Sequence, residues 1–257
     1  MTVLFGEMSR EHIRSLAPTA LAILPTASIE QHGPHLAVST DTVLCSTVAQ
    51  LSAELASSQI PVVVTPTLAF GNSHHHFPFP GVLSLTSENY YLAVTDVVEG
   101  LIKSGFRKIL ILNGHGGNTD SNRVVGLDIA NLRNHPVTIA AAAYWDVARP
   151  AIVSKGLIAG DRIPGHAGRF ETSLMMAIRP DLVFSEGLAQ TEDVSKKELG
   201  LMIPLTGATV QINGAWGAGP GYTDEPAAAS AAEGKAMLAV IVEEVAGLLV
   251  NFHKMGG

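Results

Sequence analysis

The chain has few cysteines and few charged residues, and these two features bear on its disulfide bonds and on its oligomeric state. Cys45 is the one cysteine among 257 residues, so no intrachain disulfide can form, and we expect the thiol to pack as a small apolar group. Charged residues make up 15% of the chain and hydrophobic residues 47%, which is little charge for a soluble monomer. We therefore expect apolar surface to be buried between the subunits of a homo-oligomer.

Positive charge and long apolar runs are also missing. The net charge is −7 and no basic stripe occurs, which argues against a nucleic acid or an anionic membrane as a partner. The longest apolar runs are shorter than a bilayer span, and residues 1–7 lack a basic region followed by an apolar signal core. From these features we expect a cytoplasmic protein.

Short apolar runs alternate along the chain with helical patterns and glycine-rich turns. We predict strands near residues 20–25, 61–67, 108–112 and 137–143, and helices near 41–56, 87–104, 118–133, 167–178 and 226–251. This alternation indicates a mainly parallel sheet with helices on both faces, that is, a three-layer α/β/α sandwich. No linker, charge block or repeat divides the chain, so we expect residues 1–257 to form a single domain.

Side chains that bind metals follow two of the predicted strands. Glu30 and His32 come shortly after the first strand, and because they are two residues apart their side chains leave an extended backbone on the same side. Asp41 stands at the predicted start of a helix, and His115 opens a glycine-rich turn after the third strand. Since buried parallel strands end at one common edge, we expect these four side chains to converge.

These four side chains are suited to particular metals. Carboxylate oxygens together with imidazole nitrogens favour Zn²⁺, Mn²⁺ or Fe²⁺, and the two oxygens of a carboxylate such as that of Asp41 can bridge two ions. Two such ions would hold a water as hydroxide at neutral pH. A competing interpretation is that the glycine-rich turn at residues 113–118 cradles a phosphate. That turn matches neither the dinucleotide fingerprint nor the P-loop, however, so the metal site is favoured.

Four segments occur in a fixed order along the chain. They are LPTASIEQHGPH at residues 24–35 followed by Asp41, FPGVLSL at 79–85, NGHGGN at 113–118 and HAGRFETS at 166–173. Together they resemble the creatininase (creatinine amidohydrolase) family, in a match that extends over residues 5–250. The resemblance implies an α/β amidohydrolase fold, two divalent metal ions and a homo-oligomer, commonly a hexamer.

Carried over position by position, the resemblance also implies a set of metal ligands. These ligands are Glu30, His32, Asp41 and His115, with Asp41 as the bridge. In creatininase a further ligand is a Glu two residues after the histidine of the NGHGGN segment, and this chain has Gly117 there. The departure argues against creatinine itself as the substrate. We expect Glu171, in the Glu-Thr-Ser segment, to serve as the fifth ligand and to take part in catalysis.

Further residues are expected around a substrate pocket at the same edge. His166 lies five residues before Glu171, and the resemblance makes it a candidate acid/base, a role that suits the near-neutral pKa of imidazole. The expected substrate-binding residues are His76, Tyr144, Trp145 and Asn118. An aromatic pair at a strand exit is also typical of a core, and His75 has an equal claim to be loop surface. The glycine-rich loop around Trp216 would be a lid or a subunit contact.

The sequence therefore predicts a metal-dependent hydrolase of a small amide, either a cyclic amide (lactam) or an N-formyl compound. A metal-bound hydroxide would attack the carbonyl carbon, and His166 would deliver a proton to the leaving nitrogen. The bond would be a C–N bond other than an ordinary peptide bond. Two alternatives stay open: a peptidase like the family's mycofactocin-precursor peptidase, and a metal-binding or small-molecule-binding protein without catalysis. An open ligand set is typical of catalysis.

Overall fold

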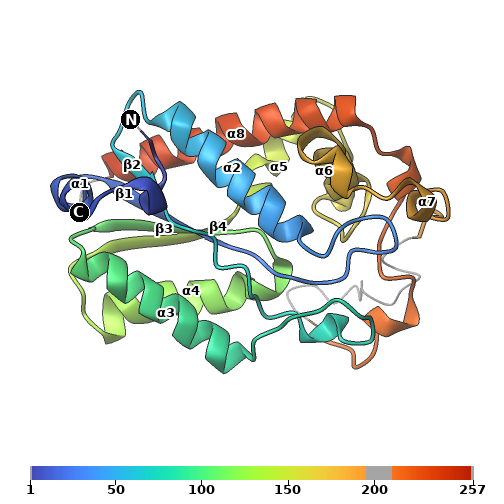
Figure 1. Ribbon diagram of the computed structural model, residues 1–257, viewed down its shortest axis with the longest axis horizontal. Coiled ribbons are helices and arrows are strands. Elements are labelled where there is room, and N and C mark those ends of the chain that lie inside the picture. The colour runs from blue at the N-terminus through green and yellow to red at the C-terminus, as the bar shows by residue number, and fades with distance from the viewer. Residues whose placement is uncertain (1, 195–209, 256–257) are drawn as a thin grey trace.

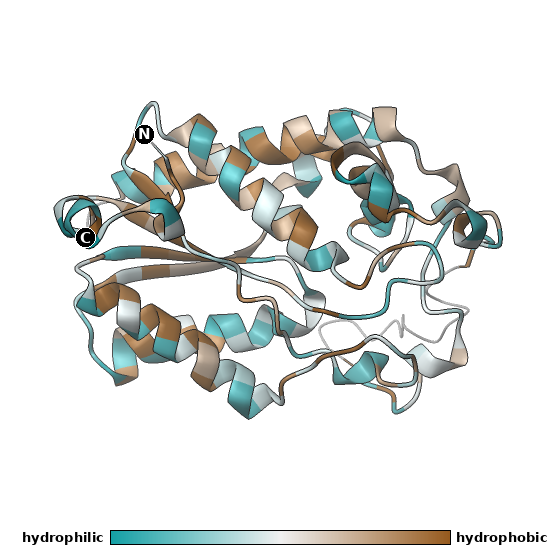
Figure 2. Ribbon diagram, in the orientation of Figure 1, coloured by the Kyte–Doolittle hydropathy of each residue, from teal (hydrophilic) through white to brown (hydrophobic). Residues whose placement is uncertain are grey.

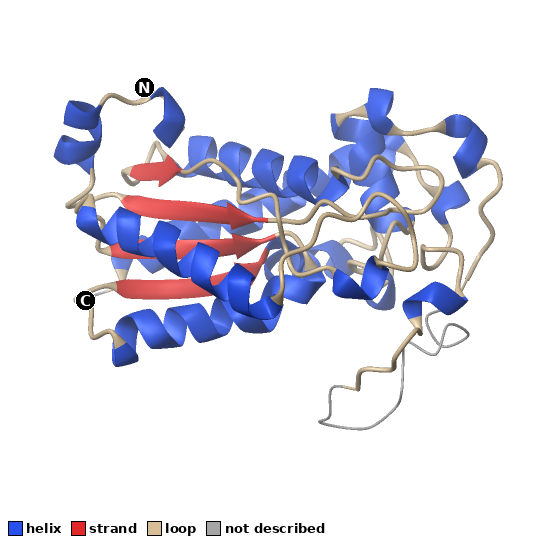
Figure 3. Cartoon of the chain, turned by 60° about the horizontal axis from the view of Figure 1, so that its bottom comes forward, coloured by secondary structure: helices blue, strands red, loops and turns tan. Residues whose placement is uncertain are grey.

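A parallel sheet forms the centre of the molecule in the computed structural model, which describes residues 2–194 and 210–255 (Figure 1). Its strands are β1 (Leu21–Thr26), β2 (Val62–Val64), β3 (Lys108–Asn113) and β4 (Thr138–Ala143). Within the described residues the strand order is β2-β1-β3-β4, and each pair is parallel. The strands all end at the same edge (Figure 3), and the loops that leave this edge carry the candidate site.

Helices cover both faces of this sheet. The α-helices of the described residues are α1 (Arg10–Leu16), α2 (Thr40–Ala56), α3 (Ser87–Lys103), α4 (Thr119–Leu127), α5 (Tyr144–Ser154), α6 (Arg169–Ile178), α7 (Ser185–Leu188) and α8 (Ala231–Lys254). In Figure 1, α3 and α4 lie below the sheet, and α2, α5, α6 and α8 lie above it. The predicted three-layer α/β/α architecture is confirmed.

Alternate residues of the central strands pack into two different cores. Leu21 and Ile23 of β1 face the cluster that contains α2, α5, α6 and α8, whereas Ala22 and Leu24 face the cluster that contains α3. Figure 2 shows the hydrophobic segments along the strands and the helices that cover them. Because both faces are covered, the strand reads as a continuous apolar run rather than as an alternating one.

The structure corrects several of the predicted elements. β2 is shorter than the predicted strand at 61–67, because the chain leaves the sheet after Val64. The predicted helix at 118–133 is divided into α4 and a π-helical turn, Asp128–Leu132. The helices α1, α5 and α7 are additional. Since α5 begins directly after β4, Tyr144 and Trp145 are helix residues.

The C-terminal helix α8 is long and apolar enough to cross a membrane by length and composition, the one such helix in the described part of the chain. It begins at Ala231 rather than near 226, and the Ser230 side chain caps it by accepting a hydrogen bond from Glu233 N–H. Its buried stripe includes Met237, Ile241, Val245 and Leu249. This stripe belongs to the core cluster shared with α2, α5 and α6, so the apolarity of α8 is accounted for by core packing.

Candidate metal centre

The loop after β1 holds Glu30 and His32 in the interior. The backbone N–H of Glu30 donates to the carbonyl of Val38 at 3.0 Å, which closes the loop on itself. The His32 Nδ1 donates to the Glu30 carbonyl at 3.1 Å, and this hydrogen bond leaves Nε2 facing the Asp41 carboxylate. Metal-binding histidines are commonly oriented by such a backbone acceptor on the other ring nitrogen.

Asp41, in the first turn of α2, stands between two imidazoles. Its Oδ1 lies 3.1 Å from Nε2 of His32, and its Oδ2 lies 3.1 Å from Nδ1 of His115. Oδ2 is buried, and within the described residues it forms no hydrogen bond besides this ion-pair contact with His115. A buried carboxylate oxygen is expected to be hydrogen-bonded or to bind a cation. The two oxygens thus fit a carboxylate that bridges two metal ions.

His115 reaches Asp41 from the end of β3. The His115 Nε2 donates to the carbonyl of Asn72 at 3.0 Å, so Nδ1 is the nitrogen that faces the carboxylates. Besides Asp41, Nδ1 contacts Oε2 of Glu30 at 3.2 Å. His115 is therefore oriented in the same way as His32, with one nitrogen on a backbone carbonyl and the other toward the centre.

A close approach between β3 and α2 brings His115 to Asp41. A Cβ at Gly114 would collide with Cys45 of α2, so only glycine allows the turn to pass this close to the helix. Cys45 is buried and its Sγ donates to the Leu112 carbonyl. Burial raises the pKa of this thiol, which makes it a packing group rather than a nucleophile, as the sequence predicted.

Glu171 enters the centre from the first turn of α6. Its Oε2 accepts a hydrogen bond from the Ala167 N–H at 2.6 Å and lies 3.8 Å from Nε2 of His32. The start of α6 is held by Asp224, whose Oδ1 accepts the backbone N–H of Arg169 at 2.8 Å. This carboxylate supplies the N-terminal hydrogen bond that the N-cap residue, a glycine, cannot make with a side chain.

His166 lies just before α6 and faces Glu30. Its Nδ1 is 3.6 Å from Oε1 of Glu30, and its Nε2 is 3.0 Å from the carbonyl of Gln31. The backbone of His166 is paired with Thr223 through both its N–H and its carbonyl. The ring stacks on His76, with centroids 4.1 Å apart. His166 is thus fixed in position beside the predicted ligands.

Among the residues that the structure describes, three sets of side chains bring ligand atoms within 4.8 Å of one another. They are His32, Asp41 and Glu171; Glu30, His75 and His115; and Glu30, His32 and His166. The five ligands predicted from the sequence are therefore brought together. Asp41 belongs to the first set, and its Oδ2 also contacts His115 of the second. Oxygen and nitrogen donors in such sets fit a divalent cation.

The charges in the centre also favour a cation. Burial would lower the pKa of His32, yet the surrounding carboxylates, that of Asp41 first, raise this pKa to about 10. Burial raises the pKa of Glu171 to about 8 against the effect of His32. Burial likewise would raise the pKa of Glu30, but neighbouring imidazoles, His115 first, hold it well below its usual range. The buried carboxyl groups thus need protons, either on themselves or on the neighbouring imidazoles, and bound divalent cations would meet this need instead.

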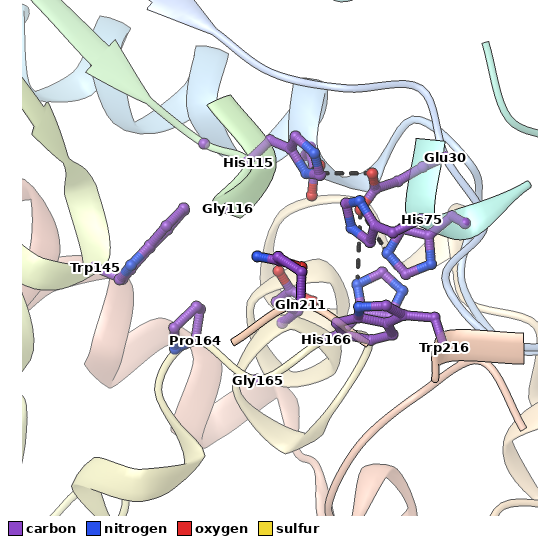
Figure 4. A pocket seen from close by; sticks show the side chains of 15 residues that line it. Glu30, His75, His115, Gly116, Trp145, Pro164, Gly165, His166, Gln211 and Trp216 are labelled. Carbon is purple, nitrogen blue, oxygen red and sulfur yellow. Dashed lines mark ion pairs between the residues drawn. The ribbon is translucent and has the colours of Figure 1, made fainter. Parts of the chain in front are cut away.

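A cavity of about 250 Å³ opens beside these ligands. The side chains of His76 and Trp145, two of the expected substrate-binding residues, line it. In Figure 4, Trp145 and Pro164 lie across the cavity from Glu30 and His75, and Trp216 lies beside His166. A polar, acidic wall with aromatic walls opposite is a suitable shape for a small ligand.

The other two expected substrate-binding residues do not line this cavity. Tyr144 is fully buried and packs edge-on against Trp145, with centroids 5.1 Å apart, so it supports the wall from behind. Asn118 donates its amide to the Ala27 carbonyl and accepts the Asn72 N–H, so its side chain holds two loops together. The structure therefore places both side chains behind the cavity wall rather than in it.

Sequence reasoning missed Gln31, which connects two of the histidines. Its Nε2 lies 3.0 Å from His76 Nδ1 and 2.9 Å from His166 Nε2, and its Oε1 accepts the Gly33 N–H. The signal was available, because Gln31 stands between Glu30 and His32 and must point to the opposite side of the extended segment. The hydrogen bond from His115 to the Asn72 carbonyl could not be predicted from the sequence, because every residue carries a backbone carbonyl.

Comparisons with known proteins agree with this geometry. The family model "Creatininase: Creatinine amidohydrolase" matches residues 6–249. The chain belongs to the creatininase family. It is 31% identical over 199 residues to the creatinine amidohydrolase of Pseudomonas putida, covering 71% of this chain and 74% of that protein. It is 30% identical over 239 residues to the mycofactocin precursor peptide peptidase of Mycolicibacterium smegmatis, covering 92% and 86%.

Solved creatininase structures share the fold of this creatininase-family chain. A crystal structure of creatinine amidohydrolase superposes with a TM-score of 0.80 at 28% identity and covers 99% of both chains. A mutant creatininase of Zn-Zn type is also similar, with a TM-score of 0.80 at 27% identity over 99% of this chain and 100% of that one. The structure named "Creatininase Mn" has a TM-score of 0.79 at 26% identity, with the same coverage. The chain is thus a hydrolase of the creatininase family with a set of candidate metal-binding residues.

Proposed function

We propose that this chain is a metal-dependent hydrolase that opens the C–N bond of a small amide, either a cyclic amide or an N-formyl compound. The observation that carries the proposal is the position of Asp41, whose two oxygens face His32 and His115 at the wall of a small cavity. Two ions of Zn, Mn or Fe would be held on either side of it, with Glu171 beside His32 and Glu30 beside His115. When bound, such ions activate water at neutral pH and polarise a carbonyl.

The residues of the chain would divide the remaining work. Trp145 and Pro164 form the cavity wall opposite the carboxylates, where they confine an amide and exclude bulk water. Burial, with the neighbouring His76, lowers the pKa of His166 well below its usual range, so this imidazole is neutral at neutral pH. With Nε2 on the Gln31 carbonyl, Nδ1 is the atom that would take a proton from the attacking water and pass it to the nitrogen of the C–N bond that breaks.

The volume of the cavity and the glycine at position 117 support a small substrate other than creatinine. About 250 Å³ admits a compact molecule. At Gly117 there is no room for a carboxylate side chain, because its Cβ would overlap the Asn72 carbonyl. We infer that creatinine is hydrolysed weakly or not at all.

A peptidase is the second candidate, and the near full-length similarity to the M. smegmatis peptidase favours it. The deciding experiment is turnover of a panel of lactams, imides, formamides, creatinine and short peptides by enzyme loaded with Zn²⁺, Mn²⁺ or Fe²⁺. We expect one small amide class to be hydrolysed, with loss of activity in a chelator and recovery on adding metal. Cleavage of peptides alone would establish the second candidate, and metal binding without any turnover would indicate a non-catalytic protein.

A further inference from the structure

The backbone around Asn72 occupies the space that a side chain at position 117 would need. A Cβ at Gly117 would overlap the Asn72 carbonyl oxygen and lie 2.6 Å from His115 Nε2, whereas a Cβ at the neighbouring Gly116 would meet nothing within 4 Å. Neither glycine has a positive φ. The requirement for glycine at 117 is therefore one of space, imposed by the loop that contains Asn72.

This loop is fixed against the metal centre at several points. The Asn72 carbonyl accepts the hydrogen bond from His115, and its N–H donates to Asn118 at 2.9 Å. The next residue, Ser73, donates its hydroxyl to the Glu30 carboxylate. Two neighbouring residues of the loop thus bind two of the candidate ligands directly. The short 3-10 helix His74–His76 follows at once, so its position relative to the centre is set by these bonds.

His75 faces the candidate ligands from this short helix. Its ring lies parallel to that of His115, with centroids 5.7 Å apart and an interplanar angle of 7°, and it also contacts Trp216. One of its nitrogens lies within 4.8 Å of ligand atoms of both Glu30 and His115. Figure 4 shows the His75 ring next to Glu30 at the wall of the cavity.

The two neighbouring histidines differ from His75 in their hydrogen bonds. Nδ1 of His74 contacts the Ser84 hydroxyl at 2.9 Å on the exposed side, and Nδ1 of His76 contacts the Gln31 amide at 3.0 Å. The ring nitrogens of His75 have no hydrogen bond with the residues that the structure describes, and the ring contacts those of His76, His115 and Trp216. A half-buried imidazole without such a partner, beside a carboxylate and a second imidazole, is available as a ligand.

We propose that His75 is a ligand of the metal ion held by Glu30 and His115, in addition to the five ligands expected from the sequence. The inference rests on the proposed metal centre. It extends that centre to a set in which Glu30, His115 and His75 hold one ion, His32 and Glu171 hold the other, and Asp41 joins them. Glycine at 117 and histidine at 75 then belong together, because the loop can approach only where residue 117 has no side chain.

The first test is metal binding by His75→Gln, with His74→Gln as the matched control. Chelator-treated protein is titrated with Zn²⁺ and followed by calorimetry, and the bound metal is counted by plasma emission. We expect His75→Gln to keep one tight ion and to bind the second at least about 10-fold more weakly, since even mutations outside the ligand shell cost 10-fold to 100-fold. Zinc K-edge absorption should show one imidazole fewer for each pair of ions. His74→Gln should bind both ions as the wild type does.

The second test moves the loop without removing a ligand. In Gly117→Ala the new Cβ must displace both the Asn72 carbonyl and the His115 ring, and with Asn72 also His75. We therefore expect the second ion to be bound at least as weakly as in His75→Gln. Gly116→Ala adds the same methyl group into open space and should leave both ions in place. Circular dichroism of each variant checks that the fold is intact.

The outcomes separate this inference from the proposed function. If wild type and His75→Gln bind two ions with equal affinity and equal imidazole counts, the assignment of His75 is wrong and the centre stands. If the wild type binds no divalent ion, both the centre and the assignment of His75 are wrong. If the second ion is weakened in His75→Gln but no amide or peptide is turned over, the ligand is confirmed and the proposed catalysis is not.

Discussion

At the scale of single residues, the proposed centre depends most on Asp41. Because its two oxygens face different imidazoles, Asp41→Ala should lose most of both metal ions, as measured by plasma emission on dialysed protein. Asp120→Ala is the control, since Asp120 is an exposed residue of α4 that forms a surface ion pair with Arg123. An Asp41→Ala protein that retains both ions and full activity would overturn the bridging role.

His166 provides a second prediction at this scale. If its Nδ1 delivers the proton to the leaving nitrogen, His166→Ala should lower kcat by roughly 10²–10⁴-fold while the metal content stays unchanged. A substrate whose leaving group needs no proton should recover much of this loss. Parallel loss of metal and activity would instead show that His166 is a ligand, as its place in a third set with Glu30 and His32 also allows.

The raised pKa of Glu171 predicts how the metal-free protein responds to pH. The pKa rises from 4.5 to about 8 on folding, so between these values the folded chain keeps a proton that the unfolded chain releases. Folding stability from this group is complete below pH 4.5 and is lost as the pH rises through about 8. In a chelator, Glu171→Gln should therefore gain Tm relative to wild type, and the gain should be larger at alkaline than at acidic pH.

The control for this measurement is Glu244→Gln, which makes the same substitution on the exposed face of α8, away from the centre. With metal bound, Glu171→Gln should instead have a lower Tm than the wild type, because a neutral amide is a poorer ligand than a carboxylate. A Tm gain of Glu171→Gln that is the same at every pH would contradict the burial of an ionisable carboxyl at this position.

At the scale of elements, the crossing of α6 and α8 fixes the helix that carries Glu171. A Cβ at Gly234 of α8 would overlap the Ser173 carbonyl of α6, whereas a Cβ at Gly247 of the same helix would meet nothing within 4 Å. Gly234→Ala should force the helices apart and cost about 1–3 kcal/mol of unfolding free energy. Gly247→Ala should instead gain roughly 0.5–1 kcal/mol, because alanine is the better helix former.

Urea unfolding of the two variants measures both effects, and the metal content of Gly234→Ala shows whether the displacement of α6 reaches Glu171. We expect weaker metal binding in Gly234→Ala and wild-type binding in Gly247→Ala. Equal stability of the two variants would mean that α8 can move away from α6 without loss of packing.

The elements that the sequence predicts well are those whose signal is local. β1 and β3 are continuous apolar runs, and α3 has a regular apolar stripe with a side-chain cap from Thr86. α5 was missed because Pro150 interrupts its pattern, and proline ordinarily ends a helix. The predicted helix at 118–133 changes after α4 into a π-helical turn. The sequence gives no signal for this change, because it depends on how the chain packs.

At the scale of the whole molecule, the convergence of the candidate ligands was predictable because each belongs to a short segment next to a strand or helix end. Glu30, His32 and His115 all follow strands that end at one edge. The approach of the loop at Asn72 to His115 could not be predicted, because it joins positions 43 residues apart through a backbone carbonyl. For the same reason the sequence could not show whether His75 lies on the loop surface or in the pocket.

The surface of the whole chain leads to the last prediction, the homo-oligomer. The chain is poor in charge, and large apolar side chains are exposed on α4 and the turn after it, with Leu127 at 61% and Leu132 at 75% exposure. Such side chains are commonly covered by another subunit. Light scattering during gel filtration should give a multiple of the 26.9 kDa chain mass, and a hexamer is the multiple that the family resemblance implies. A charge at the centre of the exposed group, Leu127→Glu, should lower this mass if these side chains form the contact, while a mass of 26.9 kDa for the wild type would show that the chain tolerates this apolar surface alone.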